Sequence, residues 1–201
     1  MERRDFLKNA IAVSGGMLGY IGWMSSLFPI AHAKTVLLRP PGALSEPAFL
    51  SRCIRCLRCV DSCPNHAITI LSSSSDVRMQ GTPAIKARRQ ACMLCNQIEG
   101  DFLRCTQVCP TGALQKVERN PAAILRNVAM GTAVIDTALC YSYNNYTCGS
   151  CYRACPFPGK AMTLGLWEKP EENAEACVGC GLCERSCIMY PHAIRVYPNV
   201  A

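Results

Sequence analysis

The 201-residue sequence predicts an α+β fold in which short helices and short strands are arranged around cysteine-rich loops. Two observations predict this fold. All sixteen cysteines fall into four sets of four, and a similar stretch follows the closing cysteine of each set: CPNHAITI, CPTGALQK, CPFPGKAMTL and CIMYPHAIRV. Each stretch places alanine before a short apolar run, so each unit is expected to be a loop, a turn and a short strand.

The spacing of the cysteines predicts the chemistry of the loops. In the first set two residues separate successive cysteines and three precede the last, and the other sets vary this pattern. The sets are Cys53, Cys56, Cys59 and Cys63; Cys92, Cys95, Cys105 and Cys109; Cys140, Cys148, Cys151 and Cys155; and Cys177, Cys180, Cys183 and Cys187. Such spacing lets a loop wrap an iron-sulfur cube while the closing cysteine reaches a neighbouring cube. The sequence therefore predicts duplicated bacterial-ferredoxin-like modules that hold four [4Fe-4S] clusters, with all sixteen cysteines as iron ligands.

Zinc and disulfides are the alternative uses of these cysteines. Zinc sites usually join two separated ligand pairs. They have no use for a third cysteine two residues on, nor for Pro64, Pro110 and Pro156 behind the closing cysteines. An even number of cysteines in an exported chain would fit disulfides. Clusters are the favoured prediction, and because so much of the chain is spent on cysteine loops, we expect the clusters to serve as the core and the cluster-free protein to be largely unfolded.

Residues 1–33 are predicted to be a twin-arginine signal peptide. Arg3 and Arg4 precede a stretch without charge from residue 9 to residue 33, which ends in the cleavage pattern Ala31-His32-Ala33. This export route carries proteins already folded around their cofactors, so it would protect the thiols from oxidation. The alternative is an uncleaved membrane anchor. The predicted location is the periplasm, peripheral to the inner membrane.

The rest of the chain divides at changes in composition. The predicted segments are an extended N-terminal arm (34–50), the first cysteine motif (51–72), a linker (73–90), a central module with the second and third motifs (91–165), and an acidic linker with the fourth motif (166–201). We expect the arm to lie as a strap across the surface, and Lys86, Arg88 and Arg89 to be solvated.

Charge and missing motifs exclude several classes of function. The formal charge of +7 omits the clusters, each of which carries about two negative charges with its thiolates, so basicity gives no support for nucleic-acid binding. The sequence has no P-loop, no dinucleotide-binding GxGxxG and no haem-attachment CxxCH. We therefore expect no nucleotide, no catalytic residue of its own, and electron transfer as the task.

The motifs together resemble a known family. The arm LRPPGA at residues 38–43, the first cysteine loop, GTP at residue 81, CPTGAL at residue 109 and CVGCGLCERSC at residue 177 are similar to the ferredoxin-type proteins NapG and MauN. The resemblance implies a periplasmic carrier that takes electrons from a membrane iron-sulfur quinol dehydrogenase, NapH, toward a periplasmic acceptor such as nitrate reductase. Alternatives are a permanent electron-transfer subunit of a molybdenum reductase or hydrogenase, and a maturation factor of the MauN kind.

Related four-cluster proteins also imply how the sets share ligands. The first set would pair with the fourth and the second with the third. The four ligand groups would be Cys53/Cys56/Cys59/Cys187, Cys177/Cys180/Cys183/Cys63, Cys92/Cys95/Cys105/Cys155 and Cys140/Cys148/Cys151/Cys109. The sequence equally permits the sequential arrangement, in which the first set pairs with the second and the third with the fourth.

Overall fold

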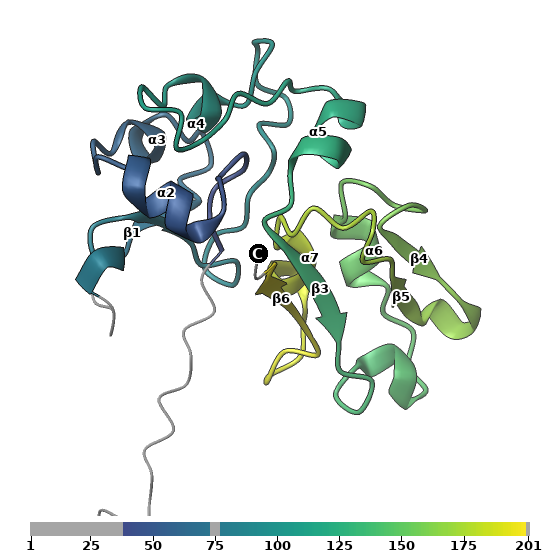
Figure 1. The fold of residues 1–201 in the computed structure, drawn as a ribbon. Helices are drawn as coiled ribbons and strands as arrows, with labels where there is room; N and C mark the ends of the chain where they lie inside the picture. The colour runs from purple at the N-terminus through teal and green to yellow at the C-terminus, as the bar shows by residue number, and fades with distance from the viewer. Residues whose placement is uncertain (1–37, 73–76, 200–201) are drawn as a thin grey trace, which may run out of the picture. The chain divides into compact units, whose positions relative to one another are not determined.

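A computed structural model describes residues 38–72 and 77–199, which fold as an α+β protein of short elements (Figure 1). The predicted signal peptide, residues 34–37, the serine-rich residues 73–76 and the last two residues lie outside the described part. No helix within the described residues is long and apolar enough to cross a bilayer.

The helices have at most two turns. The α-helices are α2 (Glu46–Arg52), α3 (Arg58–Asp61), α4 (Arg104–Gln107), α5 (Pro121–Asn127), α6 (Ser150–Ala154) and α7 (Leu182–Ser186). Single 3-10 turns are η1 (Val77–Met79), η2 (Tyr141–Asn144) and η3 (Leu166–Glu168). Four of the six α-helices carry a cysteine, and each of these helices ends one or two residues before the closing cysteine of its set.

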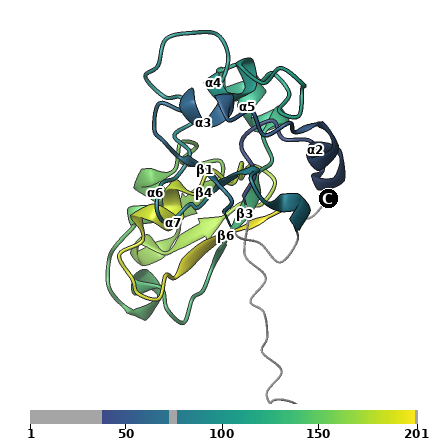
Figure 2. The same ribbon diagram turned by 90° about the vertical axis from the view of Figure 1, so that its left-hand side faces the viewer.

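The strands form three antiparallel pairs. β1 (Ile68–Ile70) pairs with β2 (Pro83–Ile85), β4 (Met162–Leu164) with β5 (Pro170–Glu172), and β3 (Gly131–Ile135) with β6 (Ile194–Pro198). The β3–β6 pair joins a segment before the third cysteine set to the segment after the fourth, and Figure 2 shows the two strands side by side. Residues 128–199 are called the second half below, and residues 38–127 the first half.

The predicted arm differs from the structure in two ways. Leu38 is only 2% exposed and Pro40 and Pro41 are fully buried, so residues 38–41 lie inside the protein and form no surface strap. Leu38 forms a β-bridge with Ile85, and Ala43 forms one with Leu114. The arm is also not extended to residue 50, because α2 begins at Glu46, has Pro47 in its first turn, where proline is tolerated, and buries Phe49.

The arm turns at Gly42. Its φ is +72°, and a Cβ at this position would lie 2.4 Å from the carbonyl oxygen of Gln115. Glycine is therefore required by both the backbone conformation and the close approach.

Three sequence expectations about secondary structure were wrong. The stretch after Cys109 forms no strand, since Leu114 makes only the isolated bridge to the arm. Both predicted linkers contain a strand: β2 lies within residues 73–90, and β5 lies in the acidic part of residues 166–201, before the fourth motif. β2 and β5 are only three residues long. Each exists as a strand because a neighbouring strand, β1 or β4, pairs with its backbone.

An apolar core lies between the cysteine loops. Phe49, Ile85, Leu103, Val117 and Met162 are among its fully buried side chains, and buried cysteines belong to the same cluster of contacts. The protein part of the core is thus larger than the cysteine-rich sequence suggested.

Arg39 is a buried charge within this core, and its hydrogen bonds are satisfied. Its guanidinium pairs with the carboxylate of Glu46, donates 2.8 Å hydrogen bonds to the Thr82 hydroxyl and the Pro83 carbonyl, and lies 4.6 Å from the centre of the Phe49 ring. These contacts hold α2 against β2.

Candidate iron-sulfur centres

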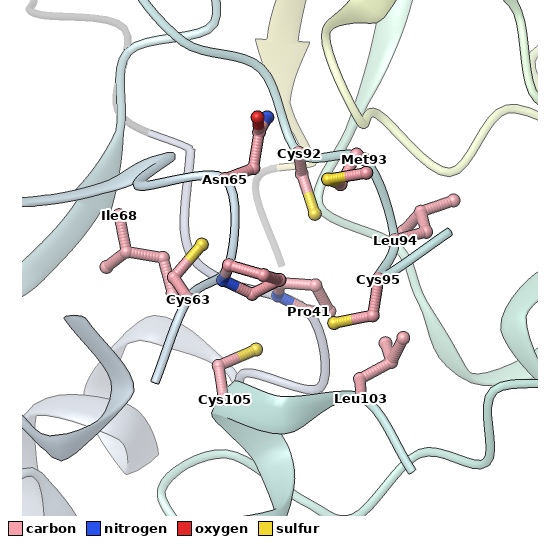
Figure 3. Close-up of a pocket in the computed structure, with 11 residues that line it drawn as sticks. Pro41, Cys63, Asn65, Ile68, Cys92, Met93, Leu94, Cys95, Leu103 and Cys105 are labelled. Atoms are coloured by element: carbon pink, nitrogen blue, oxygen red, sulfur yellow. The ribbon is translucent and has the colours of Figure 1, made fainter. Parts of the chain in front are cut away.

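Each half of the protein contains two cavities lined by four cysteines. In the first half, cavity A is lined by Cys53, Cys56, Cys59 and Cys109, and cavity B by Cys63, Cys92, Cys95 and Cys105. In the second half, cavity C is lined by Cys155, Cys177, Cys180 and Cys183, and cavity D by Cys140, Cys148, Cys151 and Cys187. Figure 3 shows the sulfurs around cavity B turned toward a common space, with Leu103 and Pro41 beside them.

Every cavity takes three cysteines from one set and the closing cysteine of another. Cys63 closes the first set but lines cavity B, and Cys109 closes the second set but lines cavity A. Cys155 and Cys187 are exchanged in the same way between cavities C and D. This exchange of the closing cysteine was predicted from the spacing.

The predicted partners in the exchange were wrong. The first set pairs with the second and the third with the fourth, so the central module of residues 91–165 does not exist as a unit. The physical reason lies in the β-pairs: β1–β2 keeps the first two sets together, and β3–β6 places the fourth set against the third. Of the two arrangements that the sequence permitted, the structure has the sequential one.

Backbone N–H groups point at several of the cysteine sulfurs. The amides of Ala67, Leu114, Arg104 and Ala133 lie 3.3 to 3.5 Å from the sulfurs of Cys63, Cys109, Cys95 and Cys177 respectively. Such N–H···S contacts stabilise thiolate charge and are typical of iron-sulfur ligands. Cavities A, B and C each have at least one N–H···S contact of this kind.

Cavity D contains a hydroxyl without a partner. Ser142 is 1% exposed and lines the cavity beside Cys140, and its Oγ has no hydrogen-bond partner among the described residues. A buried hydroxyl in this state is costly unless some acceptor receives a hydrogen bond from it. A sulfide or thiolate sulfur in cavity D would be such an acceptor.

The alternatives to clusters fit less well. All sixteen cysteines, which all lie in the described part, are free of disulfides. No three His, Cys, Asp or Glu side chains of the described residues come close enough to hold a single metal ion, as a zinc site requires. Four thiolates around a wider space fit a [4Fe-4S] cube.

Burial makes the metal-free thiols poor acids. It raises the pKa of Cys59 and Cys151 to about 11 and that of Cys180 to about 12, and it raises the pKa of Cys105 well above its usual value. Neighbouring cysteines raise these pKa values further. The thiols are therefore neutral without iron, and cluster binding must release their protons.

Cys109 is the exception among these thiols. Burial raises its pKa, but the backbone N–H of Leu114 and the hydroxyl and N–H of Thr111 outweigh burial, and the pKa is lowered.

Within each half, short helices lead from a cysteine of one cavity to a cysteine of the other. Cys59 belongs to cavity A and Cys63 to cavity B, four residues further on, across the end of α3. α4 makes the same connection through Cys105 and Cys109, and α3 packs on α4. In the second half, α6 and α7 pack together and connect cavities C and D in this way.

Cavities B and C meet where the two halves touch. The backbone N–H of Cys92 donates a 2.9 Å hydrogen bond to the carbonyl oxygen of Cys180. Beside it, Gly181 has a φ of +83°, and a Cβ there would lie 2.4 Å from the Cβ of Ala87. The cavities therefore follow one another in the order A, B, C, D.

Arg88 also stabilises the contact between the two halves, and it does so at the protein surface. Its Nη1 lies 3.0 to 3.2 Å from the carbonyl oxygens of Glu184, Arg185 and Cys187. These carbonyls are at the C-terminal end of α7, where backbone acceptors lack helical partners and a positive charge is favourable. Arg88 is exposed, as expected, but its guanidinium also bonds to the other half of the protein.

Comparison with known proteins agrees with the grouping of the first two cysteine sets. The family description "4Fe-4S dicluster domain" matches residues 52–113, which contain the first two sets, and "4Fe-4S binding domain" matches residues 174–190. A methylamine utilization ferredoxin-type protein MauM of Methylobacillus flagellatus is 38% identical over 98% of this chain and 84% of its own length. The ferredoxin-type proteins NapG of Escherichia coli and Haemophilus influenzae are 34% and 36% identical over 98% of this chain, and over 85% and 72% of their own lengths.

The chain belongs to the NapG/MauM family of ferredoxin-type proteins. It is an iron-sulfur electron-transfer protein with 4Fe-4S ferredoxin-type domains. The NapG resemblance found in the sequence is thereby confirmed, whereas the methylamine-utilisation relatives are MauM proteins and not MauN.

Sequence reasoning missed two residues of this NapG/MauM-type protein that matter to the site: Ser142 and Gly181. Ser142 lies within YSYNNYT, and nothing in that stretch marks the serine as buried. Gly181 could have been noticed, because glycine directly after a ligand cysteine indicates a left-handed turn or a close approach. No sequence signal indicates what approaches.

Proposed function

We propose that the chain holds four [4Fe-4S] clusters, one in each of cavities A to D, and relays electrons along them. The observation that carries the proposal is the order of the cavities. Two closing cysteines are exchanged within each half, and the Cys92–Cys180 hydrogen bond joins the inner cavities B and C. Electrons could then cross the protein through cysteine ligands and short helices alone.

The protein would supply three things to the relay. Thiolates hold each cluster, buried apolar side chains keep water away, and N–H and O–H donors near the sulfurs set each reduction potential. The bound clusters supply one-electron chemistry. Among the described residues the cavities are lined by cysteines and mostly apolar side chains, which suits a carrier without a substrate of its own.

We propose the periplasm as the site of this relay, with a NapH-like membrane quinol dehydrogenase as electron donor and a periplasmic reductase, such as nitrate reductase, as acceptor. Membership of the family that includes NapG supports the assignment, as does the twin-arginine pattern in the sequence. Export after folding would also explain how sixteen thiols reach an oxidising compartment without forming disulfides.

The names of the relatives favour a second candidate. Several of them are methylamine utilization ferredoxin-type proteins, so the relay could serve the maturation of a periplasmic enzyme. If a deletion strain still oxidised quinol but made an enzyme without its cofactor, maturation would be favoured. Stable co-purification with a large catalytic chain would instead favour a permanent subunit.

Spectroscopy on the exported protein tests the main proposal. We expect about sixteen iron atoms and about sixteen sulfides per chain, and EPR signals from four clusters in a redox titration. About eight iron atoms, or colourless protein containing zinc, would contradict a four-cluster relay. Sequencing the N-terminus of the same preparation tests export, with Lys34 as the expected first residue.

A further inference from the structure

The first cysteine loop, residues 52–58, is called the arginine loop below, because it presents Arg52, Arg55 and Arg58 to solvent around cavity A. All sixteen cysteines are in the described part of the chain, and Cys56, at the centre of this loop, is the only one that is exposed. Ile54 beside it is 62% exposed. Cavity A is thus the cavity whose cysteine ligands come closest to solvent.

The equivalent loop of the fourth set shows that this exposure is particular to the first. Both loops turn through two residues with positive φ: Arg55 (56°) and Leu57 (63°) in one, and Gly179 (71°) and Gly181 (83°) in the other. In the fourth set the residue at the position of Ile54 is Val178, which is 3% exposed. That loop is covered by the contact between the two halves, whereas the arginine loop has no such cover within the described residues.

Hydrogen bonds from Arg55 to residues 78 and 80 hold the arginine loop in place. The Nε of Arg55 donates a 2.9 Å hydrogen bond to the carbonyl of Gln80, and its Nη2 donates a 2.8 Å bond to the carbonyl of Arg78. Because the loop is fixed before any partner arrives, binding would cost little conformational entropy.

Charge indicates what the arginine loop would bind. Of all the residues that line the four cavities, which belong to the described part of the chain, only Arg55 carries a charge. The loop contains three arginines and no acidic residue, with Asp61 following one turn later. Cavity D, at the other end of the series, is lined by no charged side chain and lies beside the exposed Ile188.

We infer that the arginine loop is the docking surface for a redox protein with an acidic face, and that electrons enter or leave the chain through cavity A. This inference rests on the proposed relay. Each transfer moves one electron between the cluster in cavity A and the partner's redox group, and it requires no proton. The arginines attract and orient the acidic face of the partner protein. Ile54 contacts an apolar side chain of the partner, and Cys56 is the cluster ligand nearest to the partner.

Small redox reagents of opposite charge test the docking surface on the cluster-loaded chain. Ferricyanide is an anion and hexaamminecobalt(III) is a cation, and each accepts one electron from a reduced cluster. We expect R52E/R58E to slow oxidation by ferricyanide roughly ten-fold at low ionic strength. The difference should vanish at high salt, and oxidation by the cobalt complex should not be slowed. Arg55 is left unchanged because it supports the loop.

The matched control is R185E/R195E, which makes the same change in net charge at two exposed arginines of the second half. Equal slowing by both double variants would overturn the inference, because only overall charge would then matter. Iron content and the visible spectrum must match the unmodified protein in each case. If neither reagent takes electrons from the loaded chain, the relay itself fails, whereas transfer at equal rates in all variants contradicts only the docking surface.

A membrane is the other acidic surface that three arginines could meet. Flotation with vesicles of phosphatidylcholine and phosphatidylglycerol distinguishes the two. Vesicle binding that R52E/R58E abolishes, together with an unchanged ferricyanide rate, would assign the loop to lipid and overturn the inference. Loss of the ferricyanide rate without vesicle binding supports it.

Discussion

The backbone N–H of Cys92 donates a hydrogen bond of 2.9 Å to the carbonyl oxygen of Cys180. Each of these residues lines one of the two inner cavities, so the contact between the two halves is made by the backbones of two candidate cluster ligands. The structure brings the two inner sites together here without any intervening side chain, and several predictions depend on this arrangement.

Replacing Cys63 with alanine should make the second set of cysteines accessible to alkylation and leave the first set protected. Cys63 completes cavity B, so losing that ligand should expose Cys92, Cys95 and Cys105 to alkylation, while Cys53, Cys56 and Cys59 stay protected. Mass spectrometry of iodoacetamide-treated protein reads the pattern directly. C109A should give the converse result. Labelling of Cys177, Cys180 and Cys183 in C63A would support the pairing of the first set with the fourth.

Gly181→Ala should disturb the contact between the halves. The new methyl group would lie 2.4 Å from the Cβ of Ala87, and overpacking of this kind costs about 1–3 kcal/mol of unfolding free energy in addition to the backbone cost. Gly159→Ala is the matched control, since Gly159 has a similar φ of +79° and nothing within 4 Å of a Cβ. The control should lose only about 1–2 kcal/mol, the cost of a left-handed conformation. Thermal unfolding compares the two, and equal losses would refute the tight approach.

The same substitution has a spectroscopic consequence. If Gly181→Ala moves cavities B and C apart, the magnetic interaction between the reduced clusters in them should weaken, with little change within each half. EPR of the fully reduced protein measures it, and an unaltered spectrum in a destabilised variant would argue against coupling through this contact.

Arg88→Ala should destabilise the folded protein by about 1 kcal/mol. The guanidinium lies beside three carbonyl oxygens at the end of α7, but it is exposed, so water compensates part of the loss. Arg89→Ala removes the adjacent exposed arginine and should have almost no effect. Denaturant unfolding of the loaded protein provides the comparison, and an equal loss in both variants would mean that only charge matters.

Ser142→Ala should lower the reduction potential of the cluster in cavity D. The Ser142 hydroxyl is buried and unpartnered among the described residues, and a hydrogen bond to sulfur favours the reduced, more negative cluster. Redox-titrated EPR should show one of four potentials shifted downward. Ser51→Ala, at an exposed serine that bonds to the Ala48 carbonyl, should shift none, and an unchanged potential in the Ser142 variant would show that the hydroxyl does not reach the cluster.

The sequence by itself determined the local chemistry. Cysteine spacing depends on how far a short loop can reach, so the four sets and the exchange of closing cysteines could be predicted. Three of the four short strands expected after the sets, β1, β4 and β6, are present.

Only the tertiary structure decided which sets exchange ligands, which loop is covered and which is exposed. These properties depend on contacts between residues far apart in the chain. Gly131 pairs with Pro198 in the β3–β6 ladder and Cys92 meets Cys180, and no spacing rule within one loop encodes such contacts. Cys56 and Cys180 occupy the same place in nearly the same loop, yet one is exposed and the other is buried, because the other half of the protein covers only one of them.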